Sequence, residues 1–300
     1  MEQSRIHMQA MVLLPLEPWP TGTAVRCGPL VRQVLAANAS PYTYTGTQSF
    51  VVGDGRQVAV IDPGPADPAH VEALLKAIGE ATLSAILVTH THRDHSPAAL
   101  PLAAATGAPV MGCAPLAPAG DAERADAPFD ATYAPDAVMA EGDSVAGDGW
   151  TLTALATPGH TSNHLCFALR EAEALFTGDH VMGWSTSVVA PPDGDMGDYV
   201  NSLERLVGRE ERVYYPAHGE AVHKPQQLVR GMIGHRRQRE RQIVRLLAQE
   251  PRSAAALVQP MYKGLDERLK PAAEMSVMAH LIDLERRGVA ARDGLSWHLR

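Results

Sequence analysis

Short apolar runs, each ending in a turn or a polar residue, recur along the first two thirds of the chain. Residues 58–61 and 85–88 are continuous runs rich in β-branched side chains, and residues 150–156 alternate apolar and polar positions. Residues 174–176 and 213–215 are shorter runs of the same kind. Runs of this length that end at Gly, Pro or Asp are typical of strands. This part of the chain therefore predicts the sheets of an α/β domain.

The last third of the chain has a helical period instead. Apolar residues within 225–248 lie mostly three or four positions apart, and 253–261 and 271–287 have the same spacing. Ser253 is placed to cap the second of these helices, and residues 289–299 form two short runs around an Asp-Gly turn. Helices followed by a terminal hairpin are the order of a winged helix. We therefore expect a catalytic domain over 1–224 and a helical linker with a winged-helix-like domain over 225–300.

Four candidate metal ligands occupy six residues directly after the strand predicted at 85–88. They are His90, His92, Asp94 and His95. Imidazole and carboxylate groups are ligands that zinc takes and that Fe(II) and Mn(II) accept. One short loop would leave an ion under-coordinated, so further ligands must come from other strand ends. A His-rich surface loop without metal is the alternative interpretation.

Three further candidates follow three other predicted strands, each beside a glycine. They are His160, Asp179 and His218. Because loops at strand ends meet at one edge of a sheet system, we expect these side chains to join the 90–95 loop and form one site.

A second group of residues has less specific patterns. Asp62 follows the run 58–61 and is expected to orient a ligand histidine, although an Asp-Pro-Gly turn explains it equally simply. Asn163, His164 and His180 lie next to ligand candidates. They are candidates for hydrogen bonds to a substrate, and the alternative is a purely structural role.

The ordered ligand set, with the surrounding small residues, resembles the metallo-β-lactamase superfamily over residues 45–220. The resemblance implies an αββα sandwich with two metal ions. It assigns His90, His92 and His160 to one ion and Asp94, His95 and His218 to the other, with Asp179 as the bridge. A bridging aspartate resembles glyoxalase II, lactonases, phosphodiesterases and RNA-processing nucleases more than true β-lactamases. With the C-terminal pattern, the chain resembles the lactamase-like protein two subfamily, whose members are regarded as single-strand-selective endoribonucleases.

Two divalent cations would activate a water molecule for hydrolysis, with zinc the first choice and iron or manganese the alternatives. Asp94 is the candidate catalytic residue, because its carboxylate could also take up or deliver a proton. Our leading interpretation is hydrolysis of single-stranded RNA. A thioester or a lactone is the alternative substrate; β-lactam hydrolysis and iron-dependent redox chemistry are less expected, and so is a binding protein without catalysis.

Charge and composition change this picture little. The formal net charge of −8 does not favour a polyanionic partner, so RNA binding would depend on the basic segment 235–242, which could equally be a solvated helix. Three cysteines far apart indicate a reducing compartment. No apolar run is long enough for a membrane span, and residues 11–14 are too short a run for a secretory signal. We expect a cytoplasmic enzyme without a membrane partner, with a homodimer as an open alternative.

Overall fold

Two sheets stacked face to face form the larger part of the computed structural model, which describes residues 19–116, 129–265 and 267–300. The first sheet has the order β1-β2-β3-β4-β5-β6-β7. Its strands are β1 (Ala24–Arg26), β2 (Val31–Leu35), β3 (Gln48–Val52), β4 (Gln57–Ile61), β5 (Thr82–Val88), β6 (Val110–Gly112) and β7 (Ala137–Val138). Neighbours up to β4 pair antiparallel, and those from β4 onward pair parallel.

The second sheet has the order β12-β11-β10-β9-β8. Its strands are β8 (Ser144–Gly147), β9 (Trp150–Ala156), β10 (Leu165–Leu169), β11 (Ala174–Gly178) and β12 (Val213–Pro216). Only β11 and β12 pair parallel. The parallel pairs in both sheets point their carboxyl ends toward the same rim, which is where polar side chains can gather.

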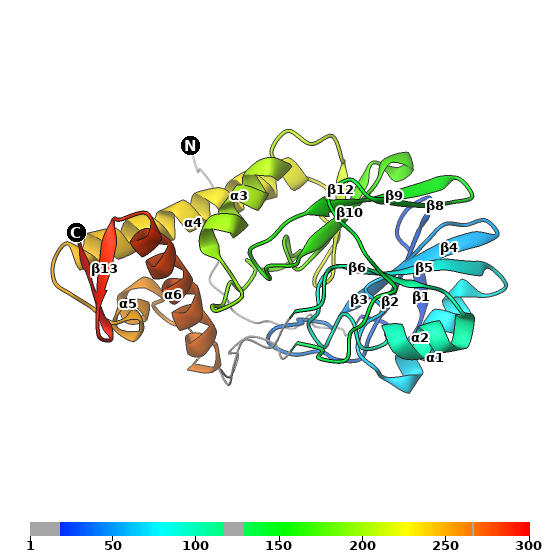
Figure 1. Ribbon diagram of the computed structural model, residues 1–300, viewed down its shortest axis with the longest axis horizontal. Helices are drawn as coiled ribbons and strands as arrows, with labels where there is room; N and C mark the ends of the chain where they lie inside the picture. Colours follow the sequence, from blue (N-terminus) through cyan, green and yellow to red (C-terminus); the bar gives the residue numbers. More distant parts are fainter. Residues whose placement is uncertain (1–18, 117–128, 266) are drawn as a thin grey trace.

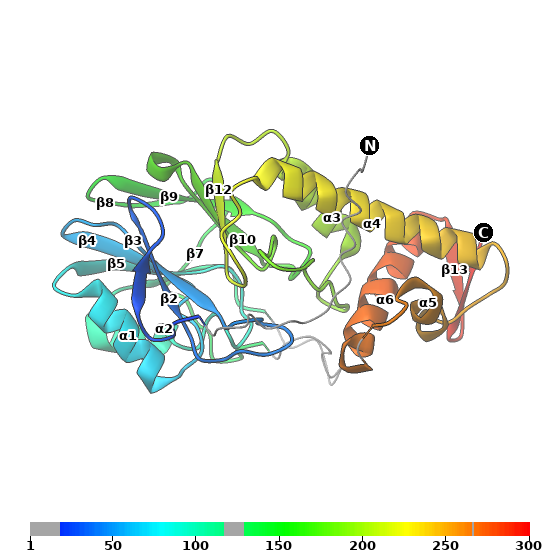
Figure 2. The same ribbon diagram turned by 180° about the vertical axis from the view of Figure 1, so that it is seen from behind.

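Helices cover the outer face of each sheet (Figures 1 and 2). Helices α1 (Pro68–Ile78) and α2 (Ala99–Thr106) lie on the first sheet, and α3 (Met196–Leu206) and α4 (Pro225–Leu247) lie on the second. Between the sheets the Phe50 ring lies 5.1 Å from Phe176 and 5.7 Å from Tyr215, centroid to centroid. The αββα sandwich expected from the sequence is confirmed.

The C-terminal segment folds around its own core. Helices α5 (Ala254–Met261) and α6 (Lys270–Arg286) precede a hairpin of β13 (Ala290–Asp293) and β14 (Ser296–Leu299). Ser253 accepts a hydrogen bond from the Ala256 amide at 3.2 Å, so it caps α5 as predicted. Trp297 of the hairpin is buried and belongs to the same apolar cluster as residues of both helices. This is the expected winged-helix arrangement.

Helix α4 belongs to both parts of the molecule. Val229 and Ile233 pack in the cluster on the second sheet, while Ile243 and Leu247 pack in the core of the C-terminal segment. The predicted boundary after residue 224 coincides with the start of α4, but the helix joins the two parts and does not separate them. That boundary stays a prediction.

One sequence prediction concerns residues outside the described ranges. It is the one made above from the apolar run 11–14. Within the described ranges, no helix combines the length and the hydropathy that a membrane span requires. Cys27, Cys113 and Cys166 are all free thiols, as their wide spacing predicts.

Candidate metal centre

Seven histidine and aspartate side chains meet at one rim of the sandwich. The loop after β5 in the first sheet supplies His90, His92, Asp94 and His95. The second sheet supplies the others: His160 follows β9, Asp179 follows β11, and His218 follows β12. They form two groups, one of His90, His92, His160 and Asp179 and one of Asp94, His95 and His218, with ligand atoms within 4.8 Å of one another in each. Each of the two groups therefore contains side chains from both sheets.

Hydrogen bonds on the far side of the rings orient the first group. His160 Nδ1 lies 2.6 Å from the Val188 carbonyl and must donate to it, so Nε2 is the ring nitrogen that is turned toward the cluster. Thr89 Oγ1 donates to Asp62 Oδ2 at 2.7 Å and is therefore free to accept from His90 Nδ1 at 3.0 Å. The Nε2 atoms of His90 and His160 lie 3.0 and 3.1 Å from His92 Nδ1.

The second group is oriented in the same way. His95 Nδ1 lies 3.0 Å from Asp62 Oδ2, and His218 Nδ1 donates to the Gly46 carbonyl at 3.2 Å. Both Nε2 atoms then face Asp94 Oδ2, at 3.3 Å from His95 and 3.1 Å from His218. The predicted orienting role of Asp62 agrees with this geometry, since its carboxylate also accepts from the Thr89 amide at 2.8 Å.

Asp179 lies between the two groups. Its Oδ2 is 3.6 Å from His160 Nε2 and 3.6 Å from His95 Nε2, and its Oδ1 is 3.4 Å from His218 Nε2. One carboxylate that faces ligands of both groups has the position that a bridge between two cations requires.

The electrostatics of the cluster favour bound cations. Burial lowers the pKa of His90 well below its usual value and that of His92 to about 3, and neighbouring imidazoles add to both shifts, so these rings are neutral with lone pairs available. Burial alone would raise the pKa of Asp94, but His95 and His218 outweigh it and keep the carboxyl ionised.

Buried polar atoms without a hydrogen-bond partner also suit a pair of divalent cations. His95 Nε2 and Asp179 Oδ1 are buried and make no hydrogen bond to any described residue. A neutral His95 this close to the carboxylates would be costly unless a positive charge lay between them; without a metal ion, the proton on His95 supplies that charge. Nitrogen and oxygen donors without thiolate suit zinc, iron and manganese alike.

The side chains differ in how far solvent reaches them. Asp94 is 18% exposed and Asp179 is 11% exposed, whereas the imidazoles of His90 and His95 are fully buried. A substrate would therefore approach the centre from the side of the two carboxylates.

Glycine 159 places His160 next to helix α3. Its φ is +135°, and a Cβ there would lie 2.2 Å from the Cα of Tyr199. Asp195 caps α3 by accepting from the Asp198 amide at 2.9 Å, and the Gly159 carbonyl accepts from the Asp195 amide at 2.9 Å. The Pro-Gly turn seen in the sequence is the point where the ligand loop and the helix make contact.

Of the three residues predicted to contact substrate, His164 and Asn163 make side-chain hydrogen bonds to the protein, whereas both ring nitrogens of His180 are buried without a hydrogen-bond partner among the described residues. His164 Nδ1 lies 2.8 Å from Thr157 Oγ1 and its Nε2 accepts from the Asp179 amide at 3.2 Å, so it holds the bridging loop. His180 is buried beside Tyr199, with ring centroids 5.1 Å apart. Asn163 donates to the Ala114 carbonyl at 2.6 Å. Their contacts give each a structural role, and substrate contact stays a prediction.

Sequence reasoning did not single out two groups that orient the ligands. Thr89 directly precedes the ligand loop, and a hydroxyl at that position is a signal that could have been used. The Val188 carbonyl is a backbone group far along the chain from His160, and no side-chain pattern points to it.

The chain was compared with known proteins. The family described as the metallo-beta-lactamase superfamily matches residues 42–218, and the beta-lactamase associated winged helix domain matches residues 253–297. A "Beta-lactamase-like protein 2 homolog" of Drosophila melanogaster is 30% identical over 297 residues, 93% of each chain. An "Atrochrysone carboxyl ACP thioesterase" of Aspergillus terreus is 30% identical over 260 residues, 82% of this chain and 76% of its own length. A beta-lactamase domain protein of Burkholderia ambifaria shares the fold, with a TM-score of 0.78 at 19% identity over 96% of this chain and 97% of its own.

Proposed function

This chain belongs to the metallo-β-lactamase superfamily, and from that premise we propose that it is a two-metal hydrolase of thioesters or similarly activated carboxylic esters. The observation that carries the hydrolase assignment is the position of Asp179, whose two oxygens face ligands of both groups. The full set of seven ligands is larger than a single-ion site needs, so it favours hydrolysis over redox chemistry at one iron.

Two divalent cations, when bound, lower the pKa of a water molecule toward neutrality and polarise a carbonyl oxygen. The side chains of the protein supply the proton transfer. Asp94 has Thr47 and two imidazoles around Oδ2, which leaves Oδ1 to take the proton of the attacking water and pass it to the leaving sulfur. The water oxygen bonds to the carbonyl carbon, the C–S bond breaks, and the products are a thiol and a carboxylic acid, which releases the second proton of the water to solvent and leaves as a carboxylate.

The basic segment 235–242 provides little support for RNA binding, because most of its basic side chains already contact other groups of the protein. Arg236 is 3% exposed and its guanidinium donates to the Ser187 carbonyl. Arg239 donates to the Met261 carbonyl at 2.7 Å, and Arg237 pairs with Glu204. Burial and the neighbouring arginines lower the pKa of His235 to about 4, so it carries no charge at neutral pH. Phosphates would need cations that are free to release counterions.

Similarity to thioesterases supports a carbonyl substrate. The Aspergillus terreus relative is named for a thioester of a carrier protein, and a second protein so named, from Aspergillus chevalieri, is 31% identical over 76% of this chain. Such an ester carries no formal charge at the reacting carbon, which agrees with a net charge of −8.

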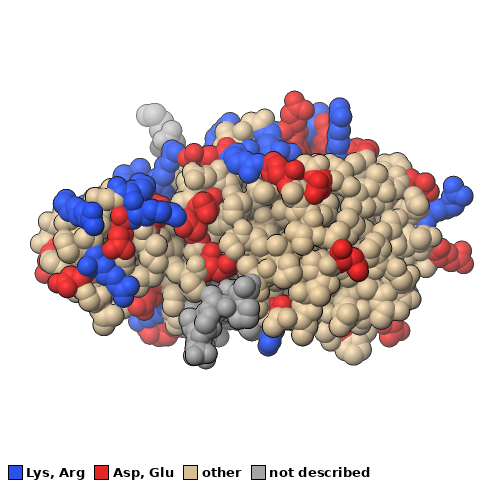
Figure 3. All heavy atoms as spheres, viewed as in Figure 1, with Lys and Arg blue, Asp and Glu red and all other residues tan. Residues whose placement is uncertain are grey.

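Single-stranded RNA is the second candidate, on one specific observation. Arg230, Arg241 and Arg245 are exposed on one face of α4, and Arg237, which pairs with Glu204, lies on the same face between them. Figure 3 shows Lys and Arg gathered over this part of the molecule with acidic residues between them, whereas the adjoining face of the sandwich is largely uncharged. Arg93 is also exposed, on the ligand loop itself.

The deciding experiment is a parallel assay of metal-loaded protein on an acyl thioester, a lactone and a labelled single-stranded RNA. Asp179→Ala and His92→Ala serve as controls, with metal content and thermal unfolding recorded for each. We expect thioester turnover that both substitutions abolish. Cleavage of RNA alone, lost in both variants, would overturn the thioester proposal in favour of the second candidate.

A further inference from the structure

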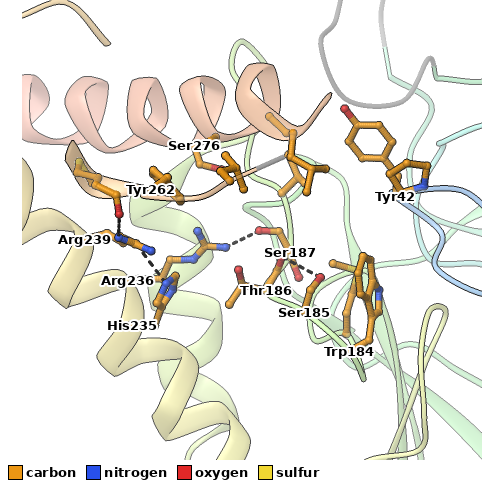
Figure 4. A pocket seen from close by; sticks show the side chains of 18 of the residues that line it. Tyr42, Trp184, Ser185, Thr186, Ser187, His235, Arg236, Arg239, Tyr262 and Ser276 are labelled. Atoms are coloured by element: carbon orange, nitrogen blue, oxygen red, sulfur yellow. Dashed lines mark hydrogen bonds between the residues drawn. The ribbon is translucent and has the colours of Figure 1, made fainter. Parts of the chain in front are cut away.

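A cavity of about 640 Å³ lies between the catalytic sandwich and the C-terminal segment, separate from the seven ligands. One wall is the loop 182–188, a second is the α4 turn at His235, Arg236 and Arg239, and a third comes from the end of α5 and from α6. Figure 4 shows Tyr42 and Trp184 at one end and the two arginines with His235 at the other. The volume is in the range of sites that hold small organic ligands.

Part of the cavity wall belongs to the loop that follows Asp179 of the metal centre. Met182 lines it and follows the bridging Asp179 by three residues. Val188 also lines it, and its carbonyl is the acceptor that orients His160. A molecule in the cavity would therefore lie beside the loop that supplies and orients two of the predicted ligands.

Most of the lining is apolar or aromatic. Met182, Trp184 and Val188 face Met261, Tyr262 and Ala272 across the space. Trp184 stacks on Tyr44 with the ring planes 11° apart, and Arg239 lies 4.2 Å from the centre of the Tyr262 ring, so both aromatic side chains are held by a neighbouring residue. Such walls suit a flat or branched hydrophobic body.

Three buried polar atoms of lining residues have no hydrogen-bond partner among the described residues. One is Trp184 Nε1, and the two at the α4 end are Arg236 Nε and His235 Nδ1. Arg239 Nε donates to His235 Nε2 at 3.3 Å, so the ring proton is on Nδ1 and both unpartnered atoms at the α4 end are donors. A buried donor left unpaired costs about 1–3 kcal/mol, so an acceptor oxygen on a ligand would be favoured at this end.

We propose that this cavity binds the acyl group of the substrate, and that this group is a bulky aromatic or branched acyl chain with an oxygen acceptor remote from the reacting carbonyl. The inference rests on the proposed thioester hydrolysis. It makes the C-terminal segment a determinant of acyl selectivity, since α4, α5 and α6 supply the deeper walls and both donors.

The test compares three thioesters of one thiol, N-acetylcysteamine, carrying acetyl, 2-naphthoyl or 6-hydroxy-2-naphthoyl groups. We expect the metal-loaded protein to prefer both naphthoyl esters over acetyl in kcat/KM by at least about tenfold. Ala272→Leu fills the cavity, and should lower the ratio of naphthoyl to acetyl kcat/KM by about tenfold. The matched control is Ala256→Leu, an exposed position on α5 outside the cavity, which should leave the ratio unchanged.

A second pair of measurements isolates the donors and guards against misfolding. We expect wild type to prefer the hydroxynaphthoyl over the plain naphthoyl ester, and Arg236→Lys, which removes the Nε donor, should reduce that preference. Calorimetric titration with 6-hydroxy-2-naphthoate gives a readout other than turnover, and its affinity should fall by about tenfold in Ala272→Leu. Ser276→Leu, on the same wall, replaces Ala272→Leu if that variant does not fold.

The outcomes separate the inference from the function on which it rests. Thioester hydrolysis with the same acyl ratio in wild type and Ala272→Leu would overturn the acyl pocket and leave the proposed function intact. Absence of any thioester hydrolysis by protein with two metal ions bound would overturn both.

Discussion

The Oδ2 atom of Asp62 lies 3.0 Å from Nδ1 of His95, and neither side chain is accessible to solvent. This carboxylate fixes the ring so that Nε2 faces the cluster, and with Asp94 and Asp179 it outweighs the effect of burial and raises the pKa of His95 well above its usual value. In the absence of a cation the imidazole is thus charged, and a metal ion must displace its proton.

Asp62→Asn keeps the size of the side chain and removes its charge. We expect metal affinity to fall by about 10–100-fold, because the ligand ring loses its anionic partner. Competition with a chromogenic chelator measures the affinity directly. Asp148→Asn, at an exposed ion pair with Arg56, is the matched control. Equal affinities in Asp62→Asn and wild type would show that the contact does not orient the ligand.

Gly159→Ala should displace α3 from the His160 turn. The added methyl carbon would meet the Tyr199 backbone at 2.2 Å and would also adopt an unfavourable positive φ. Gly142→Ala shares only the second penalty, since its φ is +88° with open space around it. The control should cost about 1–2 kcal/mol of unfolding free energy, and Gly159→Ala should cost more and also reduce metal content. Urea unfolding with metal analysis distinguishes them, and equal losses would contradict the packing argument.

Removal of metal should destabilise the whole sandwich. The two sheets each supply ligands, so a cation that binds the native state alone adds stability, by about 2.7 kcal/mol at a hundredfold excess over its Kd. Scanning calorimetry with and without a chelator should show a lower Tm in its presence. The chelator effect should shrink in Asp179→Ala, and an unchanged Tm in wild type would mean that the ligands do not hold a metal in solution.

Acid should weaken the C-terminal segment through His280. Burial and the nearby Arg236 lower the pKa of His280 to about 3, whereas an unfolded histidine titrates near 6.5. Above pH 6.5 neither state binds the proton. Below it only the unfolded state does so, and stability is lost by up to about 1.4 kcal/mol per pH unit until the folded pKa is reached.

His280→Leu tests this dependence. Both ring nitrogens of His280 are buried without a hydrogen bond to a described residue, so leucine leaves no polar partner unsatisfied. We expect urea unfolding of the leucine variant to lose less stability between pH 7 and pH 5 than wild type. Parallel pH profiles for the two proteins would contradict the argument, because the remaining histidines are common to both.

The cluster of candidate metal ligands could be predicted from the sequence because its members combine a donor side chain with a preceding strand. His160, Asp179 and His218 all follow short apolar runs, and the structure brings all three to the 90–95 loop. The C-terminal helices were predictable for the same reason, since Ser253 and the period of the apolar residues mark them clearly.

Features that depend on tertiary packing could not be predicted in this way. The basic segment resembles a solvated surface, yet Arg236 is buried because its helix packs against the Ser187 loop. The strands at Ala24–Arg26 and Val31–Leu35 lie in a region to which the sequence pattern assigned no role. The sequence of each predicted strand also does not show that the candidate ligands come from two different sheets, because strand pairing depends on residues far apart in the chain.

The division of the ligands between the sheets has a consequence for the order of events in folding. While the two halves of the sandwich are still apart, the first sheet offers a cation only the loop from His90 to His95, and the second sheet offers only His160, Asp179 and His218. Each of the two groups becomes complete only when the halves close, because each contains side chains from both sheets. Complete metal loading is thus a late event, and the number of ions bound reports whether a newly made chain has finished its assembly.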